Sequence, residues 1–165
     1  MANLVVPNLI ARYLLCVTDE LVLRGQVCFA LYTASRALTD VYRPILAEFG
    51  LTYPQYLALL VLWEYEHEEP LTVSGLGARL HLDSGTLSPL LKRLEAAGLV
   101  VRRRSAVDER RVAVELTAAG WALRGRMADV PRRMTQATGL GADDLVELRD
   151  TLTRVTRTIH QHKEQ

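Results

Sequence analysis

Cys28 is the residue whose type and position most clearly allow chemistry. It stands near the start of a long apolar helical pattern, where unpaired backbone amides and the positive end of the helix dipole favour the thiolate that attacks peroxides. Tyr32 and Tyr42 follow it at helical spacing, so their hydroxyl groups share one side of the expected helix. The pattern predicts a redox-sensing thiol, and its alternative is a buried structural cysteine packed among tyrosines.

The distance between Cys28 and Tyr42 limits how this chemistry can be assembled. The two residues are fourteen positions apart, which at about 1.5 Å per residue separates them by about 21 Å along one helix. That is too far for a hydrogen bond within one chain. If two such helices cross antiparallel in a dimer, Tyr42 of one chain, with Tyr53 just beyond it, reaches Cys28 of the other. The sequence therefore predicts that a thiol site lies at a homodimer interface.

A second set of residues has the types needed to contact nucleic acid. A recognition helix needs short polar side chains at its exposed N-terminal end, because bulky ones would hold the backbone away from DNA. The segment LDSGTLSPLLKRLEAAG has this pattern, with leucines spaced so that they face a core. The alternative is that its polar residues are ordinary cap and surface residues. The residues expected near DNA are Ser84, Thr86, Ser88, Lys92 and Arg93.

Positive charge is concentrated just after this segment. Seven lysines or arginines and three acidic residues lie between Lys92 and Arg111, although the whole chain has a net charge of only +1. Such a local patch is typical of phosphate contacts and of an arginine that enters the minor groove. We expect Arg102 to contact DNA and Arg110 to enter the groove, with Asp108 holding Arg110 extended. The alternative for the last two residues is a solvated surface ion pair.

The elements that must position these residues follow from apolar periodicity and capping signals. Apolar residues at intervals of three and four predict a long first helix, and the spacing of Thr52 and Gln55 predicts a capped second helix. Two helices joined by a short turn follow, and then two β-rich runs around a charged turn. The last helix has heptad-like apolar spacing, which favours packing against a second chain. The expected helices span residues 23–49, 54–63, 72–80, 84–98, 117–134 and 145–159.

Together these elements predict a mainly α fold. It is a winged helix-turn-helix with a two- to three-stranded β-wing and a helical dimerisation region from the N- and C-terminal helices. At 165 residues the chain is long enough for one well-buried domain. We expect residues 1–22 to form an N-terminal extension and 23–165 a single domain, in which 52–116 is the DNA-binding winged helix. The expected dimerisation helices span 23–50 and 117–162.

Composition and motifs exclude several other classes of protein. The two cysteines lack the spacing of a disulfide framework and the four histidines have no metal-ligand pattern, so we expect no metal and no bound cofactor. The apolar N-terminal stretch lacks the basic start of a signal peptide and is interrupted by polar residues. No run of about 18 uncharged apolar residues exists to span a membrane. We therefore expect a cytoplasmic protein without a membrane partner.

The stretch LDSGTLSPLLKRLEAAGLVVRRRSAVDERRVAVELTAAG resembles the recognition helix and wing of the MarR family of dimeric repressors. The resemblance includes the D-x-R motif of the wing and the L-T-x-x-G motif after it. It implies that the first and last helices intertwine in a homodimer and that each subunit offers one winged helix to one half-site of double-stranded operator DNA. It also implies that Asp108 and Arg110 take the wing roles, with the arginine in the minor groove.

The upstream stretch QVCFALYTASRALTDVYRPILAEFGLTYPQYLALLVLWE is similar to the OhrR group within that family, the repressors that respond to organic hydroperoxides. In that group a reactive cysteine occupies the position of Cys28. Tyrosines matching Tyr42 and Tyr53 assist it, and Tyr32 also matches a tyrosine found there. The resemblance implies a transcriptional repressor whose cysteine is oxidised to a sulfenic acid and capped by a low-molecular-weight thiol, after which the protein releases its operator.

The cysteine content departs from part of that group. Some members carry a second cysteine in a C-terminal helix that forms an intersubunit disulfide, whereas this chain has none after Cys28. The resemblance therefore implies the one-cysteine route. Cys16 lies in the N-terminal extension. It is a resolving partner, a bystander or the product of an upstream start codon, and we favour the bystander.

Two other functions compete with a hydroperoxide-responsive repressor. One is a MarR-type repressor relieved by a small phenolic or other ligand in a pocket between the dimer helices and the winged domain, with Cys28 structural. The other is a thiol peroxidase that uses Cys28 as its nucleophile, which would leave the basic wing without a purpose. We expect a regulator and not an enzyme.

Overall fold

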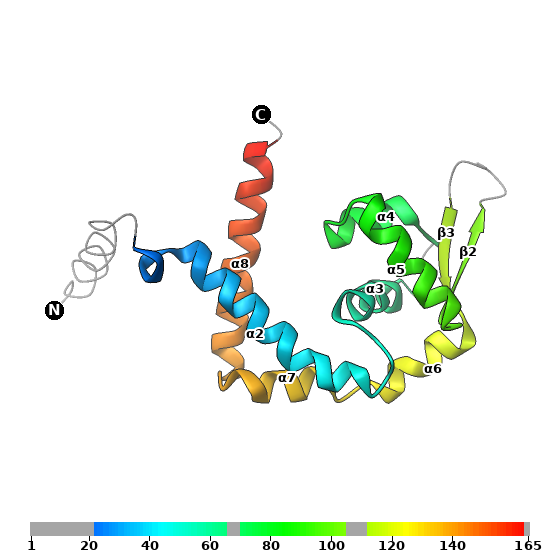
Figure 1. The fold of residues 1–165 in the computed structure, drawn as a ribbon, viewed down its shortest axis with the longest axis horizontal. Helices are drawn as coiled ribbons and strands as arrows, with labels where there is room; N and C mark the ends of the chain where they lie inside the picture. Colours follow the sequence, from blue (N-terminus) through cyan, green and yellow to red (C-terminus); the bar gives the residue numbers. More distant parts are fainter. Residues whose placement is uncertain (1–21, 66–69, 105–111, 164–165) are drawn as a thin grey trace. The chain divides into compact units, whose positions relative to one another are not determined.

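The computed structural model describes residues 22–65, 70–104 and 112–163. Cys16, Asp108 and Arg110 lie outside these residues, as does nearly all of the expected N-terminal extension. Helices predominate, with one small sheet (Figure 1). In chain order the described elements are η1 (Leu23–Gly25), α2 (Val27–Ala47), α3 (Tyr53–Glu64), β1 (Leu71–Thr72), α4 (Val73–Leu80), α5 (Ser84–Ala96), β2 (Val100–Arg104), β3 (Val112–Leu116), α6 (Ala118–Arg126), α7 (Val130–Thr138) and α8 (Ala142–Lys163).

The chain divides into two compact units within α2, between Val41 and Tyr42. In the first unit the helix begins at Val27, so the expectation of a helix from residue 23 is wrong at this end. Residues Leu23–Gly25 form a single 3-10 turn instead, and Gln26 is extended. Gly25 explains the break, because glycine is costly in a helix interior. Cys28 consequently stands in the first turn of α2.

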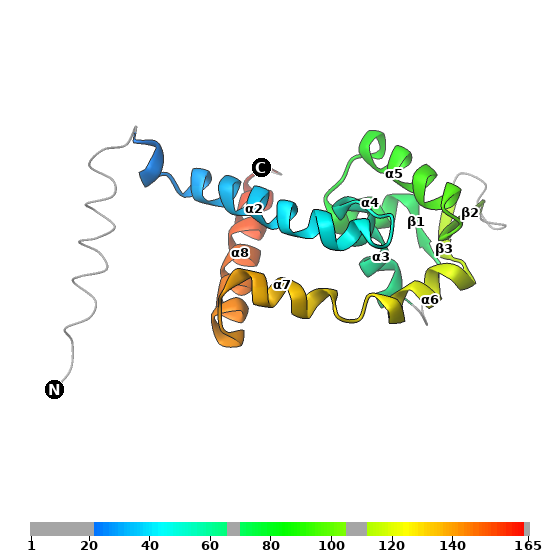
Figure 2. The same ribbon diagram turned by 60° about the horizontal axis from the view of Figure 1, so that its bottom comes forward.

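The second unit contains a helix-turn-helix formed by α4 and α5 (Figure 2). Each helix begins with a side-chain cap. The Thr72 hydroxyl accepts the amide of Gly75 at 3.0 Å, and the Asp83 carboxylate accepts the amide of Thr86 at 2.8 Å. Between the helices His81 adopts a left-handed conformation with φ of 53°, which ends α4. Local capping chemistry thus fixes both ends of the turn.

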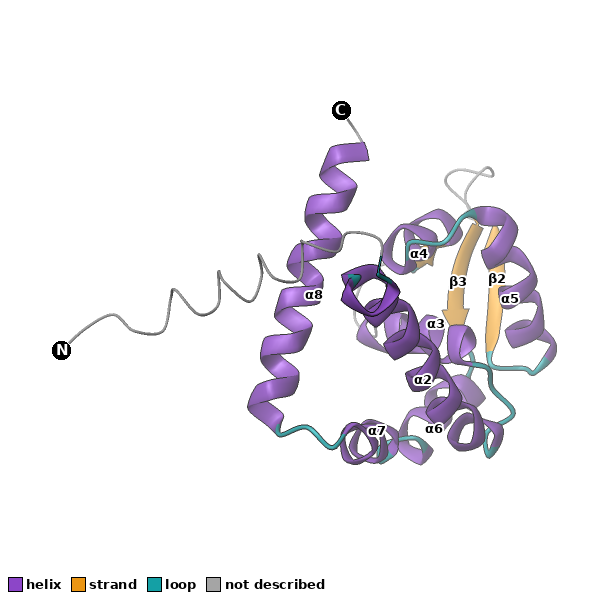
Figure 3. Cartoon of the chain, turned by 60° about the vertical axis from the view of Figure 1, so that its left-hand side comes forward, coloured by secondary structure: helices purple, strands orange, loops and turns teal. Residues whose placement is uncertain are grey.

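The wing is a three-stranded antiparallel sheet with strand order β1-β3-β2. Figure 3 shows its two longer strands, β2 and β3, side by side. Strand β3 is central and pairs with the two-residue strand β1 and with β2. At its base Val100 pairs with Leu116, and Val114 lies opposite both Leu71 and Arg102. Val100 and Val114 are buried, which places one face of the hairpin on the core. The expected two- to three-stranded wing and the mainly α fold are confirmed.

Leucines from several helices form the core of the second unit. The indole nitrogen of Trp63, in α3, donates a buried hydrogen bond of 3.0 Å to the carbonyl of Gly120, in α6. A Cβ at Gly120 would collide with the carbonyl oxygen of Leu99, so the close approach of α6 to the wing requires glycine. The largest fully buried side chains are Leu46, Leu59, Leu76, Leu87, Leu91, Leu94, Val114 and Val130.

The expectation of one continuous helix from Thr117 through Met134 is wrong. The structure has two helices there, α6 and α7, interrupted between Arg126 and Val130. Pro131 supplies the physical reason, because it has no amide hydrogen to continue the preceding helix and is well accommodated in the first turn of a new one. Met127, Val130 and Met134 are nevertheless all buried, so the apolar stripe continues across the break.

Candidate nucleic-acid interface and thiol site

Helix α5 has one buried face and one exposed polar face. Leucines at four positions of this helix are buried against the core, which leaves the polar residues of its N-terminal half at the surface. This is the division that the sequence predicted, although contact with DNA itself stays a prediction. The exposed residues are Ser84, Thr86, Ser88, Lys92 and Arg93.

Asp83 sets the conformation of this N-terminal end. Its carboxylate accepts both the amide of Thr86, at 2.8 Å, and the Thr86 hydroxyl, at 3.1 Å. These hydrogen bonds lower the pKa of Asp83, because they stabilise its charged form. The Thr86 hydroxyl therefore has its proton committed to the cap and faces its surroundings as an acceptor. Ser84 and Ser88 contribute the other exposed hydroxyls of this end of α5.

A surface groove lies beside the N-terminal half of α5. It has a volume of ≈ 550 Å³ and runs between α4, α5 and the wing strands. Ser74, Ser84 and Ser88 contribute hydroxyls to it, and Arg102 contributes a cation. Its floor is apolar and includes Leu87. The groove brings two predicted DNA-binding serines and Arg102 to one surface.

The arginines of strand β2 differ in their partners. Arg102 binds the carboxylate of Glu95, with its Nη2 at 2.6 Å from the nearer oxygen. Arg103 lies 3.4 Å from Glu115 on the neighbouring strand, and Arg104 is exposed at the strand end. The pairing of Arg102 with a residue of α5 was not predicted, because residues seven positions apart on two different elements give no periodic signal.

Cys28 is exposed in the single chain, so it is not a buried core cysteine of its own subunit. Tyr32 lies one helical turn further along α2 and is also exposed. Its hydroxyl accepts a hydrogen bond of 3.0 Å from Arg36, whose guanidinium carbon lies 5.6 Å from the centre of the Tyr32 ring. The first unit therefore presents a thiol, a phenol and a cation along successive turns of one helix.

The second unit holds a cluster of three tyrosines. The ring of Tyr42 lies 4.6 Å from that of Tyr53 and 5.8 Å from that of Tyr56, measured between centroids. Burial, together with charge repulsion from the neighbouring phenols, raises the pKa of Tyr42 to about 12. Burial also raises the pKa values of Tyr53 and Tyr56. All three hydroxyls keep their protons at neutral pH and are available as hydrogen-bond donors.

Tyr56 is the member of this cluster that was not predicted from the sequence. It follows Tyr53 by three residues, so both phenols stand on one face of α3, and this spacing was a signal that could have revealed it. Helix α3 begins where the Thr52 amide donates to the Gln55 side chain at 2.8 Å, as expected for a capping box. The cap thus positions Tyr53 in the first turn.

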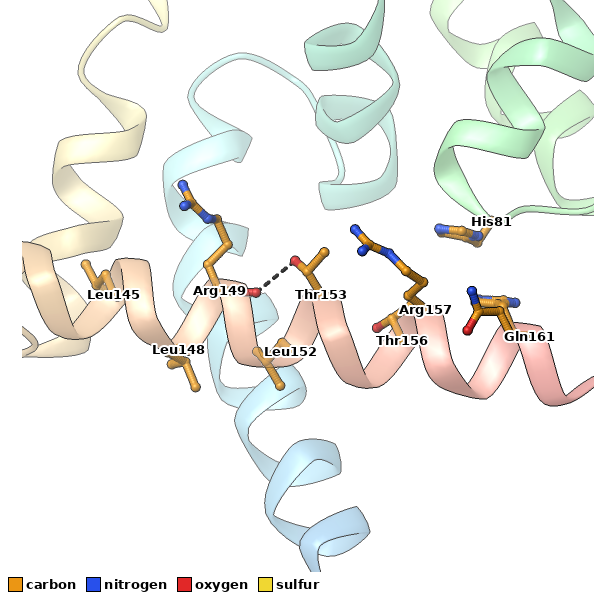
Figure 4. Close-up of a pocket in the computed structure, with 10 residues that line it drawn as sticks. His81, Leu145, Leu148, Arg149, Leu152, Thr153, Thr156, Arg157 and Gln161 are labelled. Atoms are coloured by element: carbon orange, nitrogen blue, oxygen red, sulfur yellow. Dashed lines mark hydrogen bonds between the residues drawn. The ribbon is translucent and has the colours of Figure 1, made fainter.

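Helix α8 lines an open cavity of ≈ 780 Å³ in the second unit (Figure 4). Leu145, Leu148 and Leu152 form its apolar part, while Arg149 and Arg157 supply cations. At one end His81, from the turn before α5, stacks on His160 at 4.7 Å between ring centroids. Within the described residues no group of three or more histidine, cysteine or acidic side chains could hold a metal ion.

A helix-turn-helix with a polar recognition helix, followed by a basic antiparallel wing, defines a winged-helix DNA-binding regulator. The family model of the transcriptional regulators SarA/Rot matches residues 40–124. The chain belongs to this family of MarR-like winged-helix transcriptional regulators, and the resemblance seen in the sequence is confirmed. In the described part of the chain no helix is long and apolar enough to cross a membrane.

Individual relatives cover most of the chain. The organic hydroperoxide resistance transcriptional regulator of Bacillus subtilis is 45% identical over 87% of this chain and 95% of its own length. The HTH-type transcriptional regulator TtmR of Methylorubrum extorquens is 49% identical over 86% of this chain and 71% of its own length. The structure of reduced AbfR, a Staphylococcus epidermidis protein, bound to DNA is similar with a TM-score of 0.70 and 34% identity, and the match covers 86% of this chain and 97% of that one.

Proposed function

We propose that this protein is a homodimeric repressor that senses organic hydroperoxides by oxidation of Cys28 and then releases operator DNA. The observation that carries the proposal is the exposed Cys28 thiol in the first turn of α2. The similarity to a regulator named for organic hydroperoxide resistance supports the choice of signal. The regulators in this family give no support to a thiol peroxidase.

The oxidation proceeds in two steps. The thiolate of Cys28 attacks the terminal oxygen of the hydroperoxide, so that a sulfur–oxygen bond forms, the oxygen–oxygen bond breaks and an alcohol leaves after taking a proton. The cysteine is then a sulfenic acid. A low-molecular-weight thiol attacks the sulfur, expels water and leaves a mixed disulfide. This chain has no cysteine after Cys28 and we take Cys16 as a bystander, so in the proposal the capping thiol comes from outside the chain.

The tyrosines assist this chemistry across the dimer. Tyr42 and Tyr53 form a protonated pair of phenols, and we propose that their hydroxyls donate hydrogen bonds to the Cys28 thiolate of the partner subunit. The rise of the helix places Tyr42 too far from the thiol of its own chain. Tyr32, one turn after Cys28, completes the site. Oxidation and capping remove the hydrogen-bond acceptor and add bulk at the interface, which changes the spacing of the recognition helices.

DNA binding in the proposal follows from the winged helix. Residues 52–116 form the DNA-binding part, and residues 23–50 and 117–162 form the dimer. The exposed polar face of α5 lies in the major groove, with Lys92 and Arg93 toward phosphates and with the wing, including Asp108 and Arg110, along the minor groove. The two winged helices of the dimer bind the two half-sites of an operator.

A ligand-responsive repressor is the second candidate. The cavity of ≈ 780 Å³ along α8 favours it, since its leucines and arginines suit an aromatic or aliphatic acid. In that case Cys28 is structural, and a small molecule, not oxidation, relieves repression. The two candidates differ in whether the release of DNA requires the sulfur atom of Cys28.

The test measures binding to the DNA upstream of the protein's own gene, at a stated salt concentration, before and after a stoichiometric organic hydroperoxide. A small thiol is present throughout. Wild type, Cys28→Ser and the matched control Cys16→Ser are compared. We expect wild type and Cys16→Ser to release the DNA and Cys28→Ser to stay bound.

The other outcomes decide between the candidates. If all three proteins stay bound, oxidation is not the signal and the ligand-responsive repressor takes its place. Release of DNA by Cys28→Ser would likewise contradict the assignment of the sensing thiol. Multiple turnovers of peroxide consumption with a thiol reductant would instead support a thiol peroxidase.

A further inference from the structure

Glu95 and Arg102 join the recognition helix to the wing. Glu95 lies in the last turn of α5 and Arg102 in the middle of β2. One carboxylate oxygen accepts the Arg102 guanidinium through Nε at 3.0 Å and Nη2 at 2.6 Å, and the other accepts the Arg102 backbone amide at 3.2 Å. The arginine lowers the pKa of Glu95, so the carboxylate is charged at neutral pH.

This geometry changes the role expected of Arg102. An arginine that neutralises a phosphate must supply net positive charge. Arg102 and Glu95 together are neutral, and the guanidinium already points two of its donors at the carboxylate. The backbone hydrogen bond adds a constraint on the strand itself, which a side-chain ion pair alone would not give. The arrangement is that of a brace between two elements.

A second anchor lies at the base of the same strand. The Thr117 hydroxyl donates to the carbonyl of Gly98 at 2.6 Å, and the Thr117 amide donates to the carbonyl of Leu99 at 3.1 Å. These bonds tie the start of the wing to the cap of α6. The Glu95 carboxylate then holds the middle of β2 to α5. Two anchors along one strand fix its direction relative to the recognition helix.

We propose that Glu95 and Arg102 are positioning residues for DNA binding, which hold the wing at a fixed angle to the recognition helix. They act through geometry and not through phosphate charge. The proposal rests on DNA binding by the winged helix and does not depend on hydroperoxide sensing. Its clearest consequence concerns Glu95. Removal of a negative charge beside DNA would ordinarily strengthen binding, whereas under the proposal removal of the Glu95 charge weakens it.

The test measures the affinity for the DNA upstream of the protein's own gene over a range of salt concentrations. We expect Glu95→Gln and Arg102→Gln each to weaken binding about fivefold, the effect of losing one well-formed exposed ion pair. The double variant should bind no more weakly than either single variant, because both remove the same brace. The slope of affinity against salt should stay that of wild type in all three.

A matched control comes from the exposed face of α5. Lys92→Gln removes a cation expected at a phosphate, and its salt slope should fall by about 0.9. Thermal unfolding of every variant checks that the fold is intact. Arg102→Lys provides a second route, since lysine keeps the charge but cannot form the two-donor contact. Under the proposal Arg102→Lys weakens binding as much as Arg102→Gln.

Two results would overturn the proposal. If Glu95→Gln binds as tightly as wild type or more tightly, while Arg102→Gln has a reduced salt slope, then Arg102 is an ordinary phosphate contact. If Arg102→Lys binds like wild type, the charge of the residue matters and its geometry does not. Either result would return Arg102 to the role that the sequence predicted.

Discussion

The winged helix and the long helices α2 and α8 differ in how much of their apolar surface a single chain buries. In the winged helix the apolar side chains are hidden, and Leu91 and Leu94 are 0% exposed. In α8 the apolar side chains of the heptad-like pattern lie in the open, with Leu148 45% and Ile159 52% exposed. In the first unit Val27 is 74% exposed. The winged helix, which we call the closed region, therefore has its core within one chain. Helices α2 and α8, which we call the open region, carry apolar side chains that a single chain leaves exposed.

This difference indicates where each activity is assembled. A DNA-reading surface needs a fixed arrangement of recognition helix and wing, and the winged helix supplies one from its own residues. Exposed apolar residues at heptad spacing are typical of helices that pack against a second chain. We therefore expect sensing and dimerisation to share the region that a single chain leaves open. A change at the interface then alters DNA binding without disturbing the reading surface.

The largest expected effect comes from a charged substitution on the exposed apolar face of α8, in the open region. Leu152→Lys puts a charge on the apolar face of α8, where a second chain is expected to bury it. The dimer should dissociate, and loss of simultaneous contact with two half-sites should weaken operator binding about a hundredfold or more. Analytical ultracentrifugation and DNA binding measure the two changes together.

The control for this variant lies on another face of the same helix. Val146 is 47% exposed and stands six residues before Leu152, away from the heptad-like stripe. Val146→Lys should leave both the dimer and operator binding unchanged. A dimeric Leu152→Lys protein that binds DNA like wild type would show that the apolar face of α8 is not the interface.

The second effect tests the closed region. Leu91→Ala removes a fully buried side chain on the core-facing side of the recognition helix, and should lower the free energy of unfolding by about 2–5 kcal/mol. Urea unfolding followed by tryptophan fluorescence measures the loss. The neighbouring exposed residue gives the control, since Lys92→Ala should change the stability very little. A loss below about 1 kcal/mol for Leu91→Ala would mean that the winged helix is loosely packed.

Much of the winged helix could be predicted because its signals are local. Caps at Thr72 and Asp83 and the leucine spacing of α5 are encoded within a few residues each. The break before α7 was missed because the apolar stripe continues across it and conceals the effect of Pro131. Gly25 similarly shifted the start of α2 to Val27.

The candidate sites were harder to predict where they depend on pairing. The exposed polar face of α5 followed from periodicity alone. The brace between Glu95 and Arg102 and the contact of Tyr42 with both Tyr53 and Tyr56 join residues of different elements. Only the fold decides which elements meet, so residue types and spacing could name most of the members but not their partners.

A smaller effect tests the sensing chemistry within the open region. Tyr42→Phe keeps the ring and removes the hydroxyl proposed to stabilise the thiolate. One lost hydrogen bond to a charged group should slow the release of DNA after hydroperoxide about tenfold. Stopped-flow fluorescence of labelled DNA measures the rate. Tyr65→Phe is the matched control, because the Tyr65 hydroxyl accepts from Arg79 in the winged helix. Equal rates for Tyr42→Phe and wild type would remove Tyr42 from the mechanism.

The smallest effect concerns the charge of the cap that starts the recognition helix. Asp83→Asn keeps a capping oxygen and removes a carboxylate whose pKa the hydrogen bonds from Thr86 lower below 3.8. Because the folded protein binds this proton less readily than the unfolded chain does, the charge stabilises the fold above the unfolded pKa. That contribution is lost as the pH falls through the folded value. Urea unfolding from pH 6 to acid should therefore show wild type losing slightly more stability than Asp83→Asn.

Glu48 and Glu95 also have lowered pKa values, but they titrate in both proteins and cancel in the comparison. Parallel curves would mean that the Thr86 hydrogen bonds do not distinguish the folded carboxylate from the unfolded one.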